Sequence, residues 1–347
     1  MTHASLHSFA FGLAHKNSKG DIIEVFYPLP LRAPDPALTD LVARATGFDT
    51  TGNGAVEIKQ VGLLQLQKQL LDAGFEQQAR LIQRFSTGHQ VVIACFLGTD
   101  SKPASVAEVY LKLHLLSHRL AKPNTLNLEG AFGILHNLAW TNKGPIPIDE
   151  LADRQLEHRL NGELLEVMSV DKFPKMTNYV VPPGVRIAHT ARVRLGAYIG
   201  EGTTVMHEGF VNFNAGTEGT AMVEGRISAG VWVGNNSDLG GGCSIMGTLS
   251  GGGKEVISVG ENCLIGANAG IGFPLGDRCI VEAGLYVTAG TKVNLLGRDG
   301  ALLKVVKARE LAGQPDLLLR RNSLSGAVEC VPNKTSVELN PALHGHN

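Results

Sequence analysis

The sequence of 347 residues has little of what marks several common classes of protein. Its formal net charge is −1, so no overall field of either sign favours nucleic acid or an anionic membrane as a partner. No stretch approaches the ~18 consecutive apolar residues of a membrane span. The opening MTHASLHSFAFGLAHKNSKGD lacks the basic start and sustained apolar run of a secretory signal. We therefore expect a cytoplasmic protein that binds neither nucleic acid nor membranes.

Cysteine and aromatic residues are also scarce. The five cysteines are an odd number with wide spacing, which fits a reducing cytosol rather than a disulfide framework. They form no CxxC or Cys/His pattern of a zinc site. Aromatic residues make up only 5% of the chain, whereas glycine occurs 42 times. A large conventional core usually contains more rings, so this composition indicates a repetitive architecture built from small residues.

Residues 1–170 have the pattern of a mixed α/β domain. Strand-like runs bounded by glycine occupy 20–29 and 90–98. Apolar residues at helical spacing predict helices over 62–85, 105–120 and 146–170. No catalytic signature occurs in this part, and the Gly-x-Gly-x-x-Gly fingerprint of dinucleotide-binding proteins is absent. The stretch 171–184 contains several prolines and is predicted to be a connector.

A six-residue repeat begins after the connector. In the first run, steps of six from Ile187 reach the β-branched residues Val193, Ile199, Val205 and Val211. A small residue lies four positions after each of them. The register lapses over 217–226 and again over 251–258, and about 15 hexads fit before Val293. Three hexads close one triangular coil, which predicts a parallel β-helix of about five coils over 185–295 and a C-terminal β extension over 296–347. Gly and Asn recur at its corners, where a positive φ is needed.

The flat faces of stacked coils have no cleft of their own, so the two register breaks are the leading candidates for a site. Glu224 and Arg226 lie in the first break, and residues two apart in an extended chain point to the same side. The second break contains LSGGGKE, residues 249–255. It fails the spacing of a phosphate-binding loop, so we expect it to be an excursion that folds over a long, flexible ligand. Three-sided coils also suit packing around a three-fold axis.

Two long segments of the repeat are specific enough to identify a family. VMHEGFVNFNAGTEGTAMVEGRISAGVWVGNNSDLGGGCSIMGTLSGGGKEVISVG and LIGANAGIGFPLGDRCIVEAGLYVTAGTKV closely resemble the tetrahydrodipicolinate N-succinyltransferases, in their longer actinobacterial and pseudomonad form. The resemblance covers about residues 170–330. It implies a left-handed β-helix, a homotrimer with active sites between adjacent coils, and a role in the diaminopimelate–lysine pathway. The implied reaction moves a succinyl group from succinyl-CoA to the amine of L-2-amino-6-oxopimelate, which is ring-opened tetrahydrodipicolinate.

The resemblance also assigns site residues. The acid of MVEGRIS falls on Glu224, which the family uses to take the acyl group. From its chemistry alone, a carboxylate here acts either as the nucleophile on the thioester or as the general base for the amine. Arg226 suits a substrate carboxylate, because its guanidinium offers a bidentate fork. The other implied succinyl-CoA contacts are Gly241, Ser244, Ala267, Glu282, Ala283, Gly290, Lys307, Arg320, Arg321, Asn322 and Ser323.

A metal ion is implied at Glu208, in MHEG. One such glutamate from each of three copies would form an oxygen-ligand site for Mg²⁺ or Ca²⁺. Some relatives add an Asp where this chain has Ala191, so a full carboxylate cage is not expected here and a structural role for the ion is favoured.

Four alternatives stay open. The protein could be a different hexapeptide acyltransferase that uses acetyl-CoA and a catalytic histidine such as His207, or a scaffold without catalysis. Glu224 and Arg226 could be a structural ion pair, and Lys307, Arg320 and Arg321 a solvated charged surface. A zinc site of the carbonic-anhydrase kind is excluded, because the coil region has only His189 and His207. Small-residue positions of the repeat hold Cys243, Cys263 and Cys279, which we expect to pack inertly.

Overall fold

The structure is a computed structural model that describes residues 6–247 and 256–333, and the chain divides into two compact units. The first unit comprises Met1–Ala121 and Thr125–Pro174, and the second comprises Lys122–Asn124 and Lys175–Asn347. Their boundary falls inside the stretch predicted to be a connector. Among the described residues, no helix is long and apolar enough to cross a membrane.

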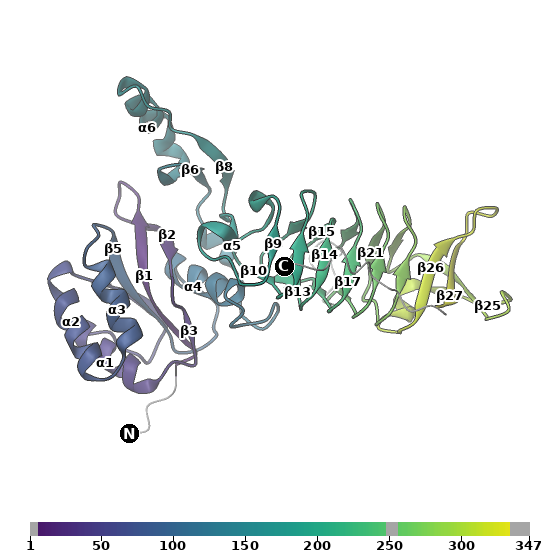
Figure 1. The fold of residues 1–347 in the computed structure, drawn as a ribbon, viewed down its shortest axis with the longest axis horizontal. Coiled ribbons are helices and arrows are strands. Elements are labelled where there is room, and N and C mark those ends of the chain that lie inside the picture. The colour runs from purple at the N-terminus through teal and green to yellow at the C-terminus, as the bar shows by residue number, and fades with distance from the viewer. Residues whose placement is uncertain (1–5, 248–255, 334–347) are drawn as a thin grey trace. The chain divides into compact units, whose positions relative to one another are not determined.

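The first unit is built around an antiparallel sheet with the strand order β2-β1-β5-β4, and β3 pairs with β1. Helices α1, α2 and α3 cover one side of the sheet and α4 the other (Figure 1). The bounds are β1 Ser8–Lys16, β2 Ile22–Phe26, β3 Leu31–Arg32, β4 Gly54–Ile58, β5 Val91–Leu97, α1 Pro36–Thr46, α2 Gln60–Asp72, α3 Glu76–Phe85 and α4 Val106–Ser117.

Alternation along β1 explains this layering. Phe9 and Phe11 pack with the α1–α3 core, and successive side chains of a strand point to opposite sides. On the α4 side, Gly12 leaves room for the ring of Tyr27, since a Cβ at Gly12 would lie 2.6 Å from that ring. Every residue of α4 is buried, including Lys112, whose ammonium donates to Asp100 and to two backbone carbonyls.

A smaller three-stranded sheet completes this unit, in the order β7-β6-β8. Its elements are α5 Ala131–Ile134, β6 Leu138–Thr141, β7 Gly144–Pro147, α6 Ile148–Leu160 and β8 Val167–Asp171. The single helix predicted over 146–170 is wrong, because this stretch contains helix α6 followed by strand β8. The helix predicted over 62–85 is likewise two helices, because Gly74 adopts a φ of +84° between α2 and α3.

The second unit is a left-handed parallel β-helix, which confirms the predicted fold class. Its strands form three faces, with corner residues at positive φ that include Asn236 (φ 55°), Gly242 (φ 70°) and Asn268 (φ 56°), as the repeat predicts. The first face holds β9 Arg186–Ile187, β11 Thr203–Val205, β14 Ala221–Val223, β17 Ser237–Leu239, β20 Leu264–Ile265 and β22 Ile280–Val281. The second holds β12 Phe210–Val211, β15 Arg226–Ile227, β18 Ser244–Ile245, β21 Gly270–Gly272 and β23 Tyr286–Thr288. The third holds β10 Ala197–Ile199, β13 Ala215–Thr217, β16 Trp232–Val233 and β19 Ser258–Val259.

Two hairpins extend the first face beyond β22. They consist of β24 Lys292–Leu296 with β25 Leu302–Lys307, and β26 Leu317–Arg321 with β27 Val328–Pro332. Strand β26 pairs in parallel with β22, so the last hairpin continues the stack of coils. Figure 1 shows these strands following the successive rungs of the coil in green and yellow.

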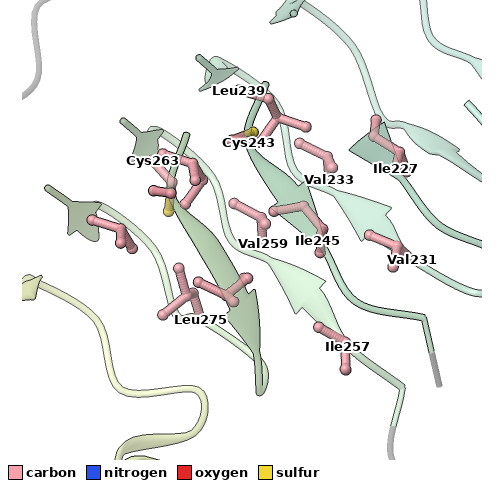
Figure 2. Close-up of a cluster of buried hydrophobic side chains, with 14 of the residues drawn as sticks. Ile227, Val231, Val233, Leu239, Cys243, Ile245, Ile257, Val259, Cys263 and Leu275 are labelled. Carbon is pink, nitrogen blue, oxygen red and sulfur yellow. The ribbon is translucent and has the colours of Figure 1, made fainter. Parts of the chain in front are cut away.

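The interior of the coil is filled by the aliphatic residues of the hexads. Figure 2 shows Ile227, Val233, Leu239, Ile245 and Val259 pointing into one core, and all of them are buried. The five cysteines are free and buried, and Cys243 and Cys263 belong to this cluster. Burial raises the pKa of the Cys243 thiol to about 12, which keeps it protonated at neutral pH.

The first register break is much smaller than the sequence indicates. Thr217, Ala221 and Val223 are fully buried members of β13 and β14, so most of 217–226 belongs to the regular coil. The irregularity is confined to one corner between the first and the second face. Ile227 follows Val223 by four positions, whereas the inward residues on either side of the other described corners between these two faces are six apart. The chain is therefore two residues short at Glu224–Gly225. The second break, including the predicted excursion 249–255, lies almost wholly outside the described residues.

Two neighbouring histidines, the buried His114 and the half-buried His118, make the first unit sensitive to acid. The backbone N–H of Tyr27 donates to Nε2 of His114, and Nδ1 of His114 lies 2.8 Å from the carbonyl of Tyr110. This network holds the ring neutral with its proton on Nδ1. Burial lowers the pKa of His114 to about 3 and that of the neighbouring His118 to about 4.

We predict that the first unit loses stability as the pH falls below 6.5. These histidines titrate near pH 6.5 in the unfolded chain but only near pH 3 to 4 in the folded unit. Between these values the unfolded chain binds more protons than the folded one, so the free energy of unfolding is highest above pH 6.5 and decreases as the pH falls toward 3. The loss between pH 7 and pH 5 should reach about 2 kcal/mol per ring at most. Hydrogen exchange of the β1 and β5 amides measures it. His114→Gln should flatten the dependence, while the same change at the exposed His89 should not; equal slopes in both variants would contradict the prediction.

Candidate active site

The corners that join the first face to the second lie in one line, which we call the Glu224 edge: Glu208, Glu224, Gly241, Ala267 and Ala283. Backbone hydrogen bonds connect successive corners, from Gly242 N to Glu224 O at 3.1 Å, Asn268 N to Gly241 O at 2.8 Å and Gly284 N to Ala267 O at 2.8 Å. In addition to Glu208, four predicted site positions are thus stacked on this edge of the coil, one per turn: Glu224, Gly241, Ala267 and Ala283.

The second face carries a matching row of outward side chains. The strand register aligns Phe210, Arg226, Ser244, Gly270 and Tyr286. Arg226 and Ser244 are therefore neighbours on adjacent coils, directly beside the Glu224 edge. The ring of Tyr286 lies over Gly270, where a Cβ would be 2.2 Å from the ring.

A hollow of about 440 Å³ opens where the Glu224 edge meets this face. It is lined by Arg192, Glu208, Phe210, Gly225, Arg226, Gly242 and Cys243. The short corner explains its position, because the chain cuts directly from Val223 to Ile227. Gly225 permits this path: a Cβ there would lie 2.2 Å from Sγ of Cys243 and 2.7 Å from its carbonyl oxygen.

Glu224 and Arg226 do not form an ion pair. Neither side chain makes a salt bridge or side-chain hydrogen bond with any described residue, although Glu224 is half-buried and Arg226 exposed. Burial is the main cause of the raised pKa of Cys243; the carboxylate of Glu224 raises it further and the guanidinium of Arg226 lowers it. Both charges therefore act on the same thiol. Among the described residues the two groups are thus not paired with each other, which does not favour the alternative of a structural pair.

Residues of the predicted RRNS contact, Arg320–Ser323, form hydrogen bonds within the protein. Arg320 donates to Glu329 at 3.0 Å and the amide of Asn322 donates to the other carboxylate oxygen at 2.8 Å. These bonds, with Asn322 the larger cause, lower the pKa of Glu329. The backbone N–H of Arg321 donates to Glu282 at 2.7 Å, which places this turn at the end of the Glu224 edge. Ser323 is exposed beside it.

Gly290 and Lys307 lie at the opposite border of the second face. Hydrogen bonds from Ala308 N to Thr291 O and from Arg309 N to Ala289 O hold the end of β25 against the turn that contains Gly290. Lys307 stands opposite Lys292 in the strand register. The predicted contacts therefore lie on both borders of one face over several coils, an arrangement that suits a long, extended ligand.

Glu208 does not have the surroundings of a cation ligand within one chain. Its Oε2 lies 3.2 Å from Arg192 and its Oε1 lies 2.9 Å from Nδ1 of His207. The hydrogen bond to His207, followed by the charge of Arg192, lowers the pKa of Glu208. Ala191 adds no ligand, and the described residues contain no group of three His, Cys, Asp or Glu side chains that could hold a metal ion.

Comparisons with known proteins identify the family. Family models match residues 60–133 (tetrahydrodipicolinate N-succinyltransferase N-terminal), 135–175 (the middle part of the same family) and 256–289 (hexapeptide repeat of succinyl-transferase). The 2,3,4,5-tetrahydropyridine-2,6-dicarboxylate N-succinyltransferase of Pseudomonas aeruginosa is 64% identical over 99% of both chains. The chain belongs to the tetrahydrodipicolinate N-succinyltransferase family.

Further relatives agree with this assignment. The enzyme of the same name from Vibrio cholerae is 59% identical over 98% of this chain and 99% of its own. A crystal structure from Campylobacter jejuni that carries the name 2,3,4,5-tetrahydropyridine-2-carboxylate N-succinyltransferase matches with a TM-score of 0.88 and 33% identity, over 97% of this chain and 94% of that one. The resemblance found in the sequence is thereby confirmed, together with the N-succinyltransferase class.

Besides the glycines Gly225 and Gly242, sequence reasoning missed two large side chains of the hollow, Arg192 and Phe210. Each directly precedes an inward residue of the second face, as Arg226 precedes Ile227. The hexad pattern contains this signal, because the residue before an inward β-branched position points outward. A comparison of charged and aromatic side chains at these outward positions on neighbouring coils would have found both.

We predict that Gly225→Ala destabilises the coil by about 1–3 kcal/mol, since the added methyl group overpacks against backbone and sulfur. Thermal unfolding monitored on the second unit measures the loss. Gly241→Ala is the matched control on the next coil, where the nearest atom to a new Cβ is 3.7 Å away. A Gly225→Ala protein as stable as the control would show that the short corner does not require glycine.

Proposed function

We propose that this protein moves the succinyl group of succinyl-CoA to the amine of L-2-amino-6-oxopimelate, the ring-opened form of tetrahydrodipicolinate, with Glu224 as the reacting carboxylate. Family membership supports the substrates, and one structural observation supports the residue. The carboxylate of Glu224 has no ion pair or hydrogen bond among the described residues. Its chain neighbours Gly225 and Arg226 line the hollow, and its Oε2 lies 3.7 Å from the position of a Cβ at Gly241, where the line of small residues begins.

As a nucleophile, Glu224 works in two steps. A carboxylate oxygen attacks the thioester carbonyl, the C–S bond breaks, and CoA leaves as the thiol after taking a proton. The neutral amine then attacks the mixed anhydride, and the Glu224 carboxylate departs. Covalent catalysis of this kind divides one difficult step into two easier ones. As a general base, Glu224 instead removes the proton of the ammonium while the amine attacks the thioester directly.

The Glu224 edge fits the donor substrate. Gly241, Ala267 and Ala283 leave the edge without bulky side chains beyond Glu224, so a pantetheine arm can lie against the backbone. Arg321 at the end of this edge and Lys307 across the face supply positive charge for the CoA phosphates. Arg226 lies beside Glu224 and suits the free carboxylate of the succinyl group or of the amine substrate.

We also propose a homotrimer in the cytoplasm. Coils with three flat faces suit a three-fold axis, and five free cysteines fit a reducing compartment. The Mg²⁺ or Ca²⁺ expected at Glu208 would need carboxylates from three copies, and each Glu208 would have to release Arg192 and His207. No step of the reaction is assigned to a metal.

The first test separates Glu224 from His207, the base expected for an acetyl-CoA enzyme. His207 is exposed and its Nδ1 is engaged by Glu208. Released thiol is measured with succinyl-CoA and acetyl-CoA. We predict that Glu224→Gln lowers turnover by about 10²- to 10⁴-fold, while His207→Ala retains it. Comparable turnover with acetyl-CoA, or the opposite pattern in the variants, would overturn the proposal.

Exchange of labelled CoA separates the two roles of Glu224. With a nucleophilic carboxylate, the protein incorporates labelled CoA into succinyl-CoA without any amine substrate, and Glu224→Gln does not. With a general base, no exchange occurs in either protein, although turnover with both substrates still depends on Glu224.

A further prediction concerns the path of the pantetheine arm. Gly241→Ala adds a methyl group to the Glu224 edge without a clash inside the chain. We expect unchanged thermal stability and a KM for succinyl-CoA raised about tenfold, because a close backbone approach is blocked. A KM equal to that of the wild-type protein would place the arm elsewhere.

A further inference from the structure

The hollow beside Glu224 begins at Arg226, Gly242 and Cys243, next to the first succinyl-CoA contacts, and extends from them toward the earlier coils. These contacts run from Arg226 toward the later coils, through Gly241, Ala267 and Ala283. Arg192, Glu208 and Phe210 belong to the earlier coils and line the opposite side of the same hollow. Two substrates must meet at Glu224, so the space on the earlier coils is available for the one that is not CoA.

The chemistry of this space suits a small anion. Arg192 and Arg226 both line it, with Phe210 in register next to Arg226. The guanidinium of Arg192 is partly exposed and donates to Glu208 twice, from Nη2 to Oε2 at 3.2 Å and from Nη1 to the backbone oxygen at 3.4 Å. A guanidinium carries five N–H groups, so donors remain for a ligand.

We propose that this hollow binds the amine substrate and that Arg192 holds one of its carboxylates, a proposal that rests on the proposed function. A seven-carbon amino dicarboxylate carries two negative charges, and Arg192 provides a second cationic anchor apart from Arg226. The ion pair of Arg192 with Glu208 is largely exposed to solvent, and such pairs contribute little, so a ligand carboxylate can share or replace it at low cost. Arg192 is a positioning residue for the acceptor, and the reacting carboxylate remains Glu224.

Arg194 offers a matched control two positions along the chain. Its guanidinium donates to Asn212 at 3.0 Å and lies 5.8 Å from the centre of the Phe210 ring. It does not line the hollow. Loss of Arg194 removes the same charge from the same coil, so it reports any general effect of charge or of coil stability.

Steady-state kinetics with both substrates varied tests the proposal. We expect Arg192→Ala to raise the KM for the amine substrate about 10- to 100-fold, the loss of one charge-assisted contact, with the KM for succinyl-CoA unchanged. Arg192→Lys should restore part of the affinity, because it keeps the charge without the fork. Arg194→Ala should leave both KM values unchanged.

Inhibition by pimelate and heptanoate tests the carboxylate directly. Pimelate has two carboxylates on seven carbons and heptanoate has one. The wild-type protein and Arg194→Ala should prefer pimelate, and Arg192→Ala should lose most of that preference. A structural role of Arg192 would not change the ratio of the two inhibition constants.

The outcomes separate this proposal from the one on which it rests. A wild-type protein that does not transfer succinyl groups would refute the proposed function. An active wild-type protein whose Arg192→Ala variant keeps its KM for the amine, raises both KM values equally, or keeps the pimelate preference would overturn the role of Arg192 alone.

Discussion

Hydrogen bonds between successive corners of the coil align the candidate residues of the Glu224 edge. The bond from Gly242 to the carbonyl of Glu224, and its equivalents at Asn268 and Gly284, align the corners into one edge. A residue on that edge is therefore followed by a functional neighbour 16 to 26 positions later rather than three or four. The coil converts distant sequence positions into a continuous surface, and its length suits a ligand that is extended rather than compact.

One corner departs from this regularity, and the hollow of the candidate site lies there. The removal of two residues between Val223 and Ile227 leaves both inward side chains buried, so the core is not disturbed. What changes is the path of the backbone, which passes so close to Cys243 that only glycine fits at position 225. The hollow opens beside that path, next to the Glu224 carboxylate, which has no ion pair among the described residues. The carboxylate of Glu224 is thereby held on a rigid element, which preserves its position better than a loop would.

The repeat made the β-helix predictable, because an inward aliphatic residue at every sixth position is compatible with few other folds. The predicted extent of the first break was wrong: Thr217 and Val223 still fit the step of six from Val211 and are buried, although Thr217 is not aliphatic. Only the positions after Glu224–Gly225 are shifted, because the corner there is two residues short. In the first unit, apolar spacing continued through Gly74 and through 161–170, where a positive φ and a return to extended backbone end the helices. Strand β1, Ser8–Lys16, was not predicted, and it lies at the centre of its sheet.

The candidate site was predictable only in part. Resemblance to the family assigned the residues of the Glu224 edge, and the structure shows why they belong together. It also shows that Arg320 and Asn322 hold Glu329 within the last hairpin, which no spacing reveals. Arg192 and Phe210 do not stand out in their own hexads, because an outward position of a hexad tolerates any side chain; only a comparison of the outward positions on neighbouring coils brings them out. The charge of Arg192 becomes meaningful once the register places it in one row with Phe210 and Arg226. The row is cationic and aromatic before Arg226 and continues with the small residues Ser244 and Gly270 directly after it. The two sides of Arg226 therefore differ chemically, as suits a transferase in which two different substrates meet.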